Sequence, residues 1–268
     1  MINLLTFDIE EWFHANYDVV DLLGKFGEDE RLKFNTQRFL SLCERHNARA
    51  TFFILARTAE KYPDIVLMIK EKGHEIATHG YSHVLVYKQS PEEFEEDLKR
   101  SIDVLQGITG EKIVGYRAPS WSSYQNFDWF FRILERNEII YDSSIFPMKT
   151  FLYGDRYAER FPYRINNIIE IPATTLNLLG MRVPFSGGFY LRFFPYSFIK
   201  MGIKNLNKQN QPAMIYLHPR EIDDLTPKLD LPFKERFIHY VNLKTAEKKL
   251  DRLLESFKFS SIKDYLNI

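Results

Sequence analysis

The sequence predicts an α/β protein whose parallel strands form a barrel or a doubly wound sheet. Short buried strands alternate with amphipathic helices along most of the 268 residues, and this alternation favours parallel pairing. Polar side chains follow several of these strands, at the end where both architectures place their active sites. The length suits one large domain, so we expect residues 1–268 to fold as a single unit.

The first half of the chain contains the clearest elements. The strongest helix signal is a capping box, in which Ser90 and Glu93 flank a proline at the first helical position, Pro91. Elsewhere, buried apolar runs predict strands, and apolar residues at helical spacing predict helices. We expect strands at residues 2–7, 50–55, 75–77, 113–116 and 139–141, and helices at 35–46, 59–72 (broken by Pro63), 90–106 and 127–136.

The second half of the chain is less regular. Its first part, residues 149–192, is rich in glycine, proline and aromatic residues. The last predicted helix is amphipathic, because Leu250, Leu253 and Leu254 lie on one face. We expect strands at residues 168–171 and 213–217, and helices at 195–207 and 245–257.

The composition argues against several classes of function. Lysine plus arginine equal aspartate plus glutamate at 36 each, which disfavours a nucleic-acid binder held by phosphate contacts. The single cysteine, Cys43, excludes an internal disulfide and a cysteine-rich zinc site. We find neither a signal-peptide pattern nor an apolar stretch of membrane-spanning length, so we expect a cytoplasmic location. The composition leaves the oligomeric state open.

Acidic residues follow the first predicted strand at Asp8, Glu10 and Glu11. Side chains alternate along a strand, so Asp8 and Glu10 share a direction and Ile9 points away from them. Two carboxylates at the mouth of a barrel suit a metal ligand and a general base. Taken alone, the same residues would also fit a solvated acidic strand end.

Two histidines, His79 and His83, follow the predicted strand at residues 75–77. Imidazoles four residues apart can bind one metal ion if the segment turns helically. No glutamate follows His79, so this is not the zincin pattern. Two histidines and one carboxylate leave coordination positions open for water and substrate, which is the ligand set of a hydrolytic centre.

Arg117, Asp142 and His218 each follow a different later strand. An arginine at this position can hold an active-site carboxylate with two hydrogen bonds. A histidine on a late strand end can serve as a second acid or base opposite the first group. The chain has neither a Gly-x-Ser-x-Gly elbow nor a phosphate-binding P-loop, which argues against a serine hydrolase and a nucleotide-phosphate site.

The order of these motifs resembles that of the polysaccharide deacetylases, a carbohydrate esterase family with a NodB-type homology domain. The resemblance extends from about residue 2 to 222, and the paired histidines and the full order are its most specific features. It implies a distorted (β/α) barrel, usually of seven strands, and a divalent ion, commonly zinc, with cobalt, nickel and iron as alternatives. It also implies a role for each motif residue: general base for Asp8, metal ligands for His79 and His83, orientation of the base for Arg117, tuning of the acid for Asp142, general acid for His218 and the acetyl-methyl pocket for Leu217.

The first motif departs from the family pattern of two adjacent aspartates, of which the second binds metal. Ile9 follows Asp8 here, and strand alternation makes Glu10 the better ligand, with Glu11 as a second candidate. This Asp-x-acid variant resembles intracellular or exopolysaccharide-linked members of the family. The segment 186–192 also resembles a feature of the exopolysaccharide-linked members, and we expect it to shape the substrate groove.

The resemblance implies removal of N-acetyl or O-acetyl groups from an amino-sugar polymer or glycan. Aromatic residues make up 15% of the chain, and Trp12, Trp121, Tyr124 and Phe189 are candidates to stack on sugar rings or to pack in the core. Two alternatives remain open. One is an amidohydrolase acting on a small cytoplasmic amide, ureide or nucleotide-linked sugar, and the other is a degenerate barrel that binds glycan without hydrolysis.

Overall fold

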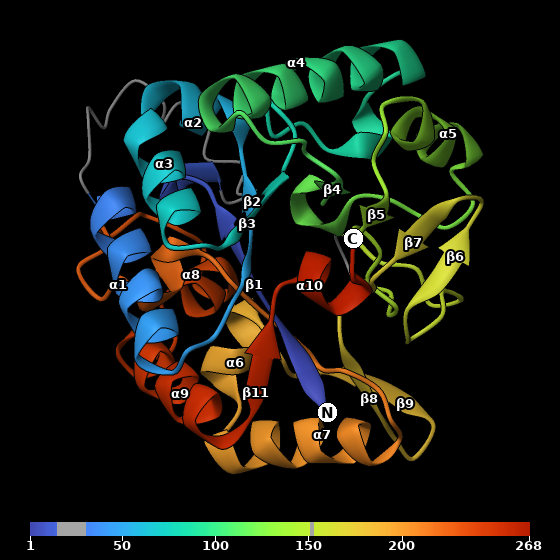
Figure 1. Ribbon diagram of the computed structural model, residues 1–268. Helices are drawn as coiled ribbons and strands as arrows, with labels where there is room; N and C mark the ends of the chain where they lie inside the picture. Colours follow the sequence, from blue (N-terminus) through green and yellow to red (C-terminus); the bar gives the residue numbers. More distant parts are fainter. Residues whose placement is uncertain (15–30, 151–152) are drawn as a thin grey trace.

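The computed structural model describes residues 1–14, 31–150 and 153–268, and its centre is a curled sheet (Figure 1). The strand order is β10-β1-β2-β3-β4-β5-β7-β6, and β11 also pairs with β1. All pairings from β10 to β7 are parallel, whereas β6 is antiparallel to β7. The α/β class and the distorted-barrel architecture are therefore confirmed, as a half-barrel, but the sheet has nine strands among the described residues and not the seven that the resemblance implied. The strands are β1 (Ile2–Ile9), β2 (Thr51–Ile54), β3 (Glu75–Thr78), β4 (Gly115–Tyr116), β5 (Tyr141–Asp142), β6 (Tyr163–Ile165), β7 (Ile168–Glu170), β10 (Met214–Leu217) and β11 (Lys258–Ser260).

Helices surround the convex face of this sheet (Figure 1). The predicted capping box is present, because Ser90 accepts a hydrogen bond from the Glu93 amide and the Glu93 carboxylate accepts one from the Ser90 amide. The expected helix at 59–72 is two helices that meet at Tyr62 and Pro63. The helices are α1 (Arg31–Arg45), α2 (Ala56–Lys61), α3 (Pro63–Glu71), α4 (Pro91–Thr109), α5 (Asp128–Arg136), α6 (Gly188–Phe193), α7 (Tyr196–Lys208), α8 (Phe233–Tyr240), α9 (Leu243–Ser256) and α10 (Ile262–Leu266).

Each strand expected from the sequence is present, but several short elements of the second half were not expected. These are β6, β11, α6, α8, α10 and the hairpin of β8 (Thr175–Leu178) and β9 (Met181–Pro184). They are too short to show a clear apolar period. None of the described helices has the length and apolar character needed to cross a membrane.

Strand alternation divides the buried residues into an outer and an inner set. On β1, Leu5 and Phe7 belong to the outer apolar cluster, in which the ring of Phe7 stacks on that of Phe39 from α1 at 4.1 Å. Burial of a side chain of this kind contributes about 1.5–3 kcal/mol. On β10, Met214 and Tyr216 belong to the inner cluster. The concave side of the sheet therefore holds the alternate residues of each strand, and the polar groups of the site extend from it.

Candidate metal-centred active site

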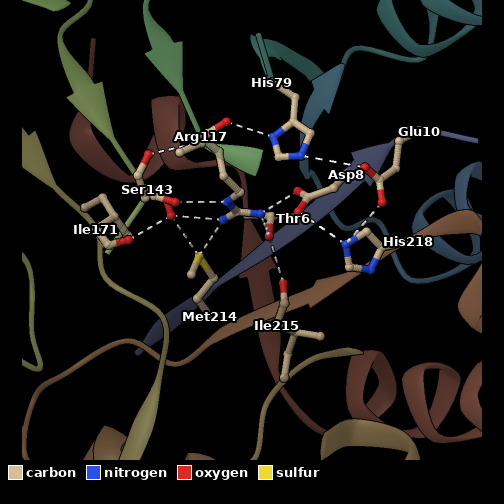
Figure 2. A network of polar contacts seen from close by, with 12 residues as sticks. Thr6, Asp8, Glu10, His79, Arg117, Ser143, Ile171, Met214, Ile215 and His218 are labelled. Carbon is tan, nitrogen blue, oxygen red and sulfur yellow. Dashed lines mark hydrogen bonds and ion pairs between the residues drawn. The ribbon is translucent and has the colours of Figure 1, made fainter. Parts of the chain in front are cut away.

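Glu10 is the first residue after β1, and its carboxylate lies on the concave side of the sheet (Figure 2). Ile9 packs in the outer cluster, as strand alternation predicts. The other candidate, Glu11, points elsewhere and forms an ion pair with Lys61 of α2, with 3.6 Å between Oε1 and Nζ. The geometry therefore favours Glu10 over Glu11 as a carboxylate ligand.

Glu10, His79 and His83 form a cluster in which one possible ligand atom from each residue lies within 4.8 Å of the others. Oε2 of Glu10 is 2.7 Å from Nε2 of His83 and 3.9 Å from Nε2 of His79. Nδ1 of His79 lies 2.8 Å from the backbone oxygen of Arg117, which fixes the ring so that Nε2 faces the cluster (Figure 2). A backbone partner on the second ring nitrogen is the usual arrangement for a metal-binding histidine.

The segment between the two histidines is an irregular turn and not a helix. Gly80 and His83 both have left-handed backbone angles, with φ of +77° and +61°. Asp97 of α4 holds this turn, because its carboxylate accepts hydrogen bonds from the amides of Tyr81 (2.7 Å) and Ser82 (3.0 Å). Asp97 is thus a supporting residue that the motif spacing did not reveal.

The charges in the cluster suit a site for a cation. Burial alone would raise the pKa of Glu10, but the imidazoles of His83, His218 and His79 outweigh it and hold this pKa well below its usual value. For His79, burial disfavours the charged imidazolium and lowers the pKa to about 4. The site therefore presents a carboxylate and a neutral imidazole, which are the protonation states that bind metal ions.

Arg117 binds the other carboxylate of the first motif, that of Asp8, from inside the barrel (Figure 2). Its Nη1 donates to Oδ1 of Asp8 at 2.6 Å and to Oγ1 of Thr6 at 2.9 Å. Its Nε and Nη2 donate to the backbone and side-chain oxygens of Ser143 at 3.2 and 3.0 Å. Thr6 could have been found from alternation, since it lies two residues before Asp8, whereas Ser143 comes from a distant strand end.

His218 follows β10 and lies beside both carboxylates of the first motif. Its Nε2 is 3.7 Å from Oδ2 of Asp8 and 3.8 Å from Oε1 of Glu10. The pairing of Phe7 with Leu217 on neighbouring strands produces this proximity. The side chain of His218 is 17% exposed, so a solvent-borne substrate can reach it.

Asp142 does not take the place that the resemblance assigned to it. Its carboxylate accepts a hydrogen bond from the Ser144 hydroxyl and faces the carboxyl group of Glu170 on β7, and it makes no described contact with His218. Burial raises the pKa of Asp142 to about 6. Burial and the charge of Asp142 raise the pKa of Glu170 well above its usual value. The expected tuning of His218 by Asp142 is therefore wrong in this structure.

Two of the expected substrate contacts are also wrong. Leu217 packs in the outer cluster, because alternation along β10 turns Tyr216 inward and Leu217 toward the helices. Trp121 is buried, and its ring covers the guanidinium of Arg117 with 4.7 Å between the ring centroid and Cζ. It therefore supports the arginine and presents no face to a sugar.

Of the other three aromatic candidates, Trp12 is buried, whereas Tyr124 and Phe189 are half-buried, and their contacts with sugar stay predictions. The ring of Tyr124 packs near those of Tyr87 and Phe127. Phe189, from the segment 186–192, stacks on Phe193 and meets the edge of Phe237.

The fold and the strand-end cluster place the chain among α/β half-barrel proteins whose site lies at the carboxyl ends of the strands. Residues 4–129 match the family model described as polysaccharide deacetylase. Residues 143–267 match a domain of unknown function, DUF3473. The two matched regions contribute strands to the same sheet, since β1 pairs with β2 on one side and with β10 on the other.

Curated relatives match part of the chain. It is 31% identical over 124 residues to the peptidoglycan-N-acetylglucosamine deacetylase of Bacillus cereus, which covers 43% of this chain and 45% of that protein. It is 34% identical over 86 residues to chitin deacetylase 1 of Saccharomyces cerevisiae, covering 32% of this chain and 28% of that protein. The chain thus spans less than half the length of these relatives.

Solved structures match almost the whole chain. A putative polysaccharide deacetylase from Mycobacterium smegmatis superposes with a TM-score of 0.66 at 16% identity, covering 98% of this chain and 88% of that chain. A family 4 carbohydrate esterase from Streptomyces lividans gives a TM-score of 0.53 at 13% identity, covering 97% and 91%. At these identities the likeness shows a common fold, and it extends across both matched regions.

Proposed function

We propose that this protein is a metal-dependent deacetylase that removes N-acetyl or O-acetyl groups from an amino-sugar polymer or glycan. The observation that carries the proposal is the convergence of Glu10, His79 and His83 directly beside Asp8 and His218. The names of the relatives, a peptidoglycan deacetylase and a chitin deacetylase, support the substrate class.

The donor set fits a divalent ion, and zinc is the one that we propose. One carboxylate and two imidazoles are common zinc ligands and leave positions open, although cobalt, nickel and iron accept the same set. Glu10 and His79 are nearly inaccessible to solvent, so a cation would also balance a carboxylate that is costly to bury alone. When bound, such an ion would supply Lewis acidity to an acetyl carbonyl oxygen and to a nearby water.

Asp8 and His218, which lie beside this cluster, each carry out one of the two proton transfers. Asp8 is the general base: Arg117 holds its Oδ1, and Oδ2 remains to accept a proton from water that attacks the acetyl carbonyl carbon. His218 is the general acid, because its Nε2 faces the same region and an amine leaves only when it is protonated. Each of these roles is typically worth about 10²–10⁴ in rate.

The direct test combines metal analysis with acetate release. The purified protein would be stripped with chelator, reloaded with zinc and assayed on N-acetylglucosamine oligomers and on a peptidoglycan fragment. We expect about one ion per chain, release of acetate that requires the ion, and loss of at least roughly a hundredfold in turnover in His218→Ala. A bound ion without acetate release would point to a different amide or ester. No bound ion after zinc addition would refute the metal-dependent activity.

A further inference from the structure

The second ring nitrogen of His218, Nδ1, faces a carboxylate that the motif comparison does not mention. Oε1 of Glu221 lies 3.9 Å from Nδ1, on the side of the ring opposite to Asp8 and Glu10. Both Nδ1 and Oε2 of Glu221 are buried and have no hydrogen-bond partner among the described residues. A shift of about 1 Å would bring the two residues into the usual N–H···O range of ~2.9 Å.

Local backbone structure places this carboxylate beside the ring. The 3-10 turn η4 (Pro219–Ile222) begins directly after His218, and the Glu221 amide donates to the His218 carbonyl at 2.9 Å. Side chains three residues apart lie above one another in such a turn, so Glu221 and His218 share one face. Only 1% of Glu221 is exposed, so its carboxylate cannot turn away into solvent.

Arg192 of α6 holds Glu221 from its other side. Nη2 of Arg192 lies 3.4 Å from Oε1 of Glu221. The same guanidinium donates to the backbone carbonyls of Ile238, His239 and Val241 near the end of α8. A buried arginine with four acceptors has a fixed position, and a buried carboxylate beside it stays charged and oriented.

We propose that Glu221, held by Arg192, is the positioning residue for His218 and fills the role that the family resemblance assigns to Asp142. This inference rests on the proposed deacetylase function. Asp142 is committed to Ser144 and Glu170, whereas Glu221 is the carboxylate that faces Nδ1. All three residues of the proposed unit, His218, Glu221 and Arg192, come from the region matched by the domain of unknown function.

The protons and electrons balance as follows when His218 protonates the leaving amine. Nδ1 of His218 keeps its hydrogen throughout and forms a hydrogen bond with Glu221 through it. The proton that is transferred to the substrate is therefore the one on Nε2. When the carbon–nitrogen bond breaks, its electron pair goes to the sugar nitrogen, which takes the proton from Nε2. The products are acetate and a free amine, and the imidazole is left neutral with its hydrogen on Nδ1, still facing Glu221.

Two substitutions test the proposal in the zinc-loaded protein. Glu221→Gln removes the charge but keeps an acceptor oxygen, and Glu221→Met removes the acceptor at similar length. We expect kcat on an N-acetylglucosamine oligomer to fall about tenfold in the first and about a hundredfold in the second, the range typical of a supporting partner, with KM little changed. Glu255→Gln, on the exposed face of α9, is the matched control and should behave like the wild type.

An ester substrate separates positioning of the acid from general damage to the site. Hydrolysis of 4-nitrophenyl acetate releases a phenolate, which needs no proton from His218, so both variants should hydrolyse it at nearly the wild-type rate. Equal losses on amide and ester, or wild-type turnover of the amide, would overturn the proposal. A wild-type protein that releases no acetate from any acetylated sugar would instead reject the proposed function.

Nitrogen NMR of the labelled, zinc-loaded protein gives a readout that does not depend on activity. The imidazole nitrogen shifts of His218, assigned by comparison with His218→Gln, report which ring nitrogen carries the hydrogen. At a pH at which the ring is neutral, we expect the Nδ1–H form in the wild type and Glu255→Gln, and loss of that preference in Glu221→Met. An unchanged tautomer in Glu221→Met would overturn the positioning role even if the protein proved inactive on every substrate.

Discussion

Arg117 supports the site from within the barrel, and its replacement by methionine should be one of the most destabilising single changes in the chain. Only 1% of the residue is exposed, and its hydrogen bonds reach Asp8, Thr6 and Ser143. Arg117→Met keeps the apolar stem but leaves the buried Asp8 carboxylate without its partner. Breaking a buried pair in this way costs about 3–5 kcal/mol. For a chain of this length that corresponds to a fall of roughly 6–20 °C in melting temperature.

A double-mutant cycle shows whether the cost comes from the unpaired carboxylate. Asp8→Asn, Arg117→Met and the double variant would be unfolded in urea with chelator present, followed by circular dichroism and by tryptophan fluorescence. Because Asp8→Asn removes the buried charge, the double variant should be more stable than the sum of the single changes predicts, by at least about 1 kcal/mol. Additivity within about 0.5 kcal/mol, or a cost below about 1 kcal/mol for Arg117→Met, would refute the reasoning.

Three further predictions concern the ligand, the buried acid pair and a helix cap. Glu10→Gln should lower zinc affinity by at least about tenfold in a competition titration, whereas Glu11→Gln should not, and the reverse would move the ligand to Glu11. Since the pKa of Glu170 is raised in the folded state, the native chain loses stability as pH rises above the unfolded value of about 4.3. Glu170→Gln should therefore gain urea stability relative to wild type between pH 5 and pH 8, and a difference that does not change with pH would contradict this. Ser90→Ala should cost about 1 kcal/mol by removing the capping box, and a control such as Glu96→Gln, exposed and beyond the first turn of α4, should leave the urea midpoint unchanged.

Strand alternation is the part of the site that the sequence predicted best. It required only that β1 continue to Ile9, and it correctly gave Asp8 and Glu10 one direction and Ile9 the other. The same rule applied to β10 would have placed His218 inward and Leu217 outward. The error at Leu217 arose because its role was carried over from the family and was not checked against the alternation of its own strand.

The remaining differences depend on contacts between residues that are distant in the sequence. Asp142 meets Glu170 because β5 and β7 pair in a particular register, and no local pattern fixes the register of two such short strands. The turn between His79 and His83 depends on Asp97, which comes from the first half of a helix on the outer layer. A motif spacing of four residues is compatible with a helix and with a turn, so spacing alone could not decide the backbone path.

The two matched regions share one sheet, and together they form the proposed site. The polysaccharide deacetylase region supplies the cluster of Glu10, His79 and His83 and the proposed base Asp8, whereas the region of unknown function supplies the proposed acid His218. The join between them is the parallel pairing of β1 with β10, which sets the two strand ends side by side. Under the proposed mechanism, a change in the second region can therefore alter proton transfer without changing the proposed metal ligands. For the same reason, the first region alone would present the proposed metal ligands and the base but no acid, and it would lose the strand that covers one edge of β1. The proposed site therefore depends on the sheet that the two matched regions share, and on neither region alone.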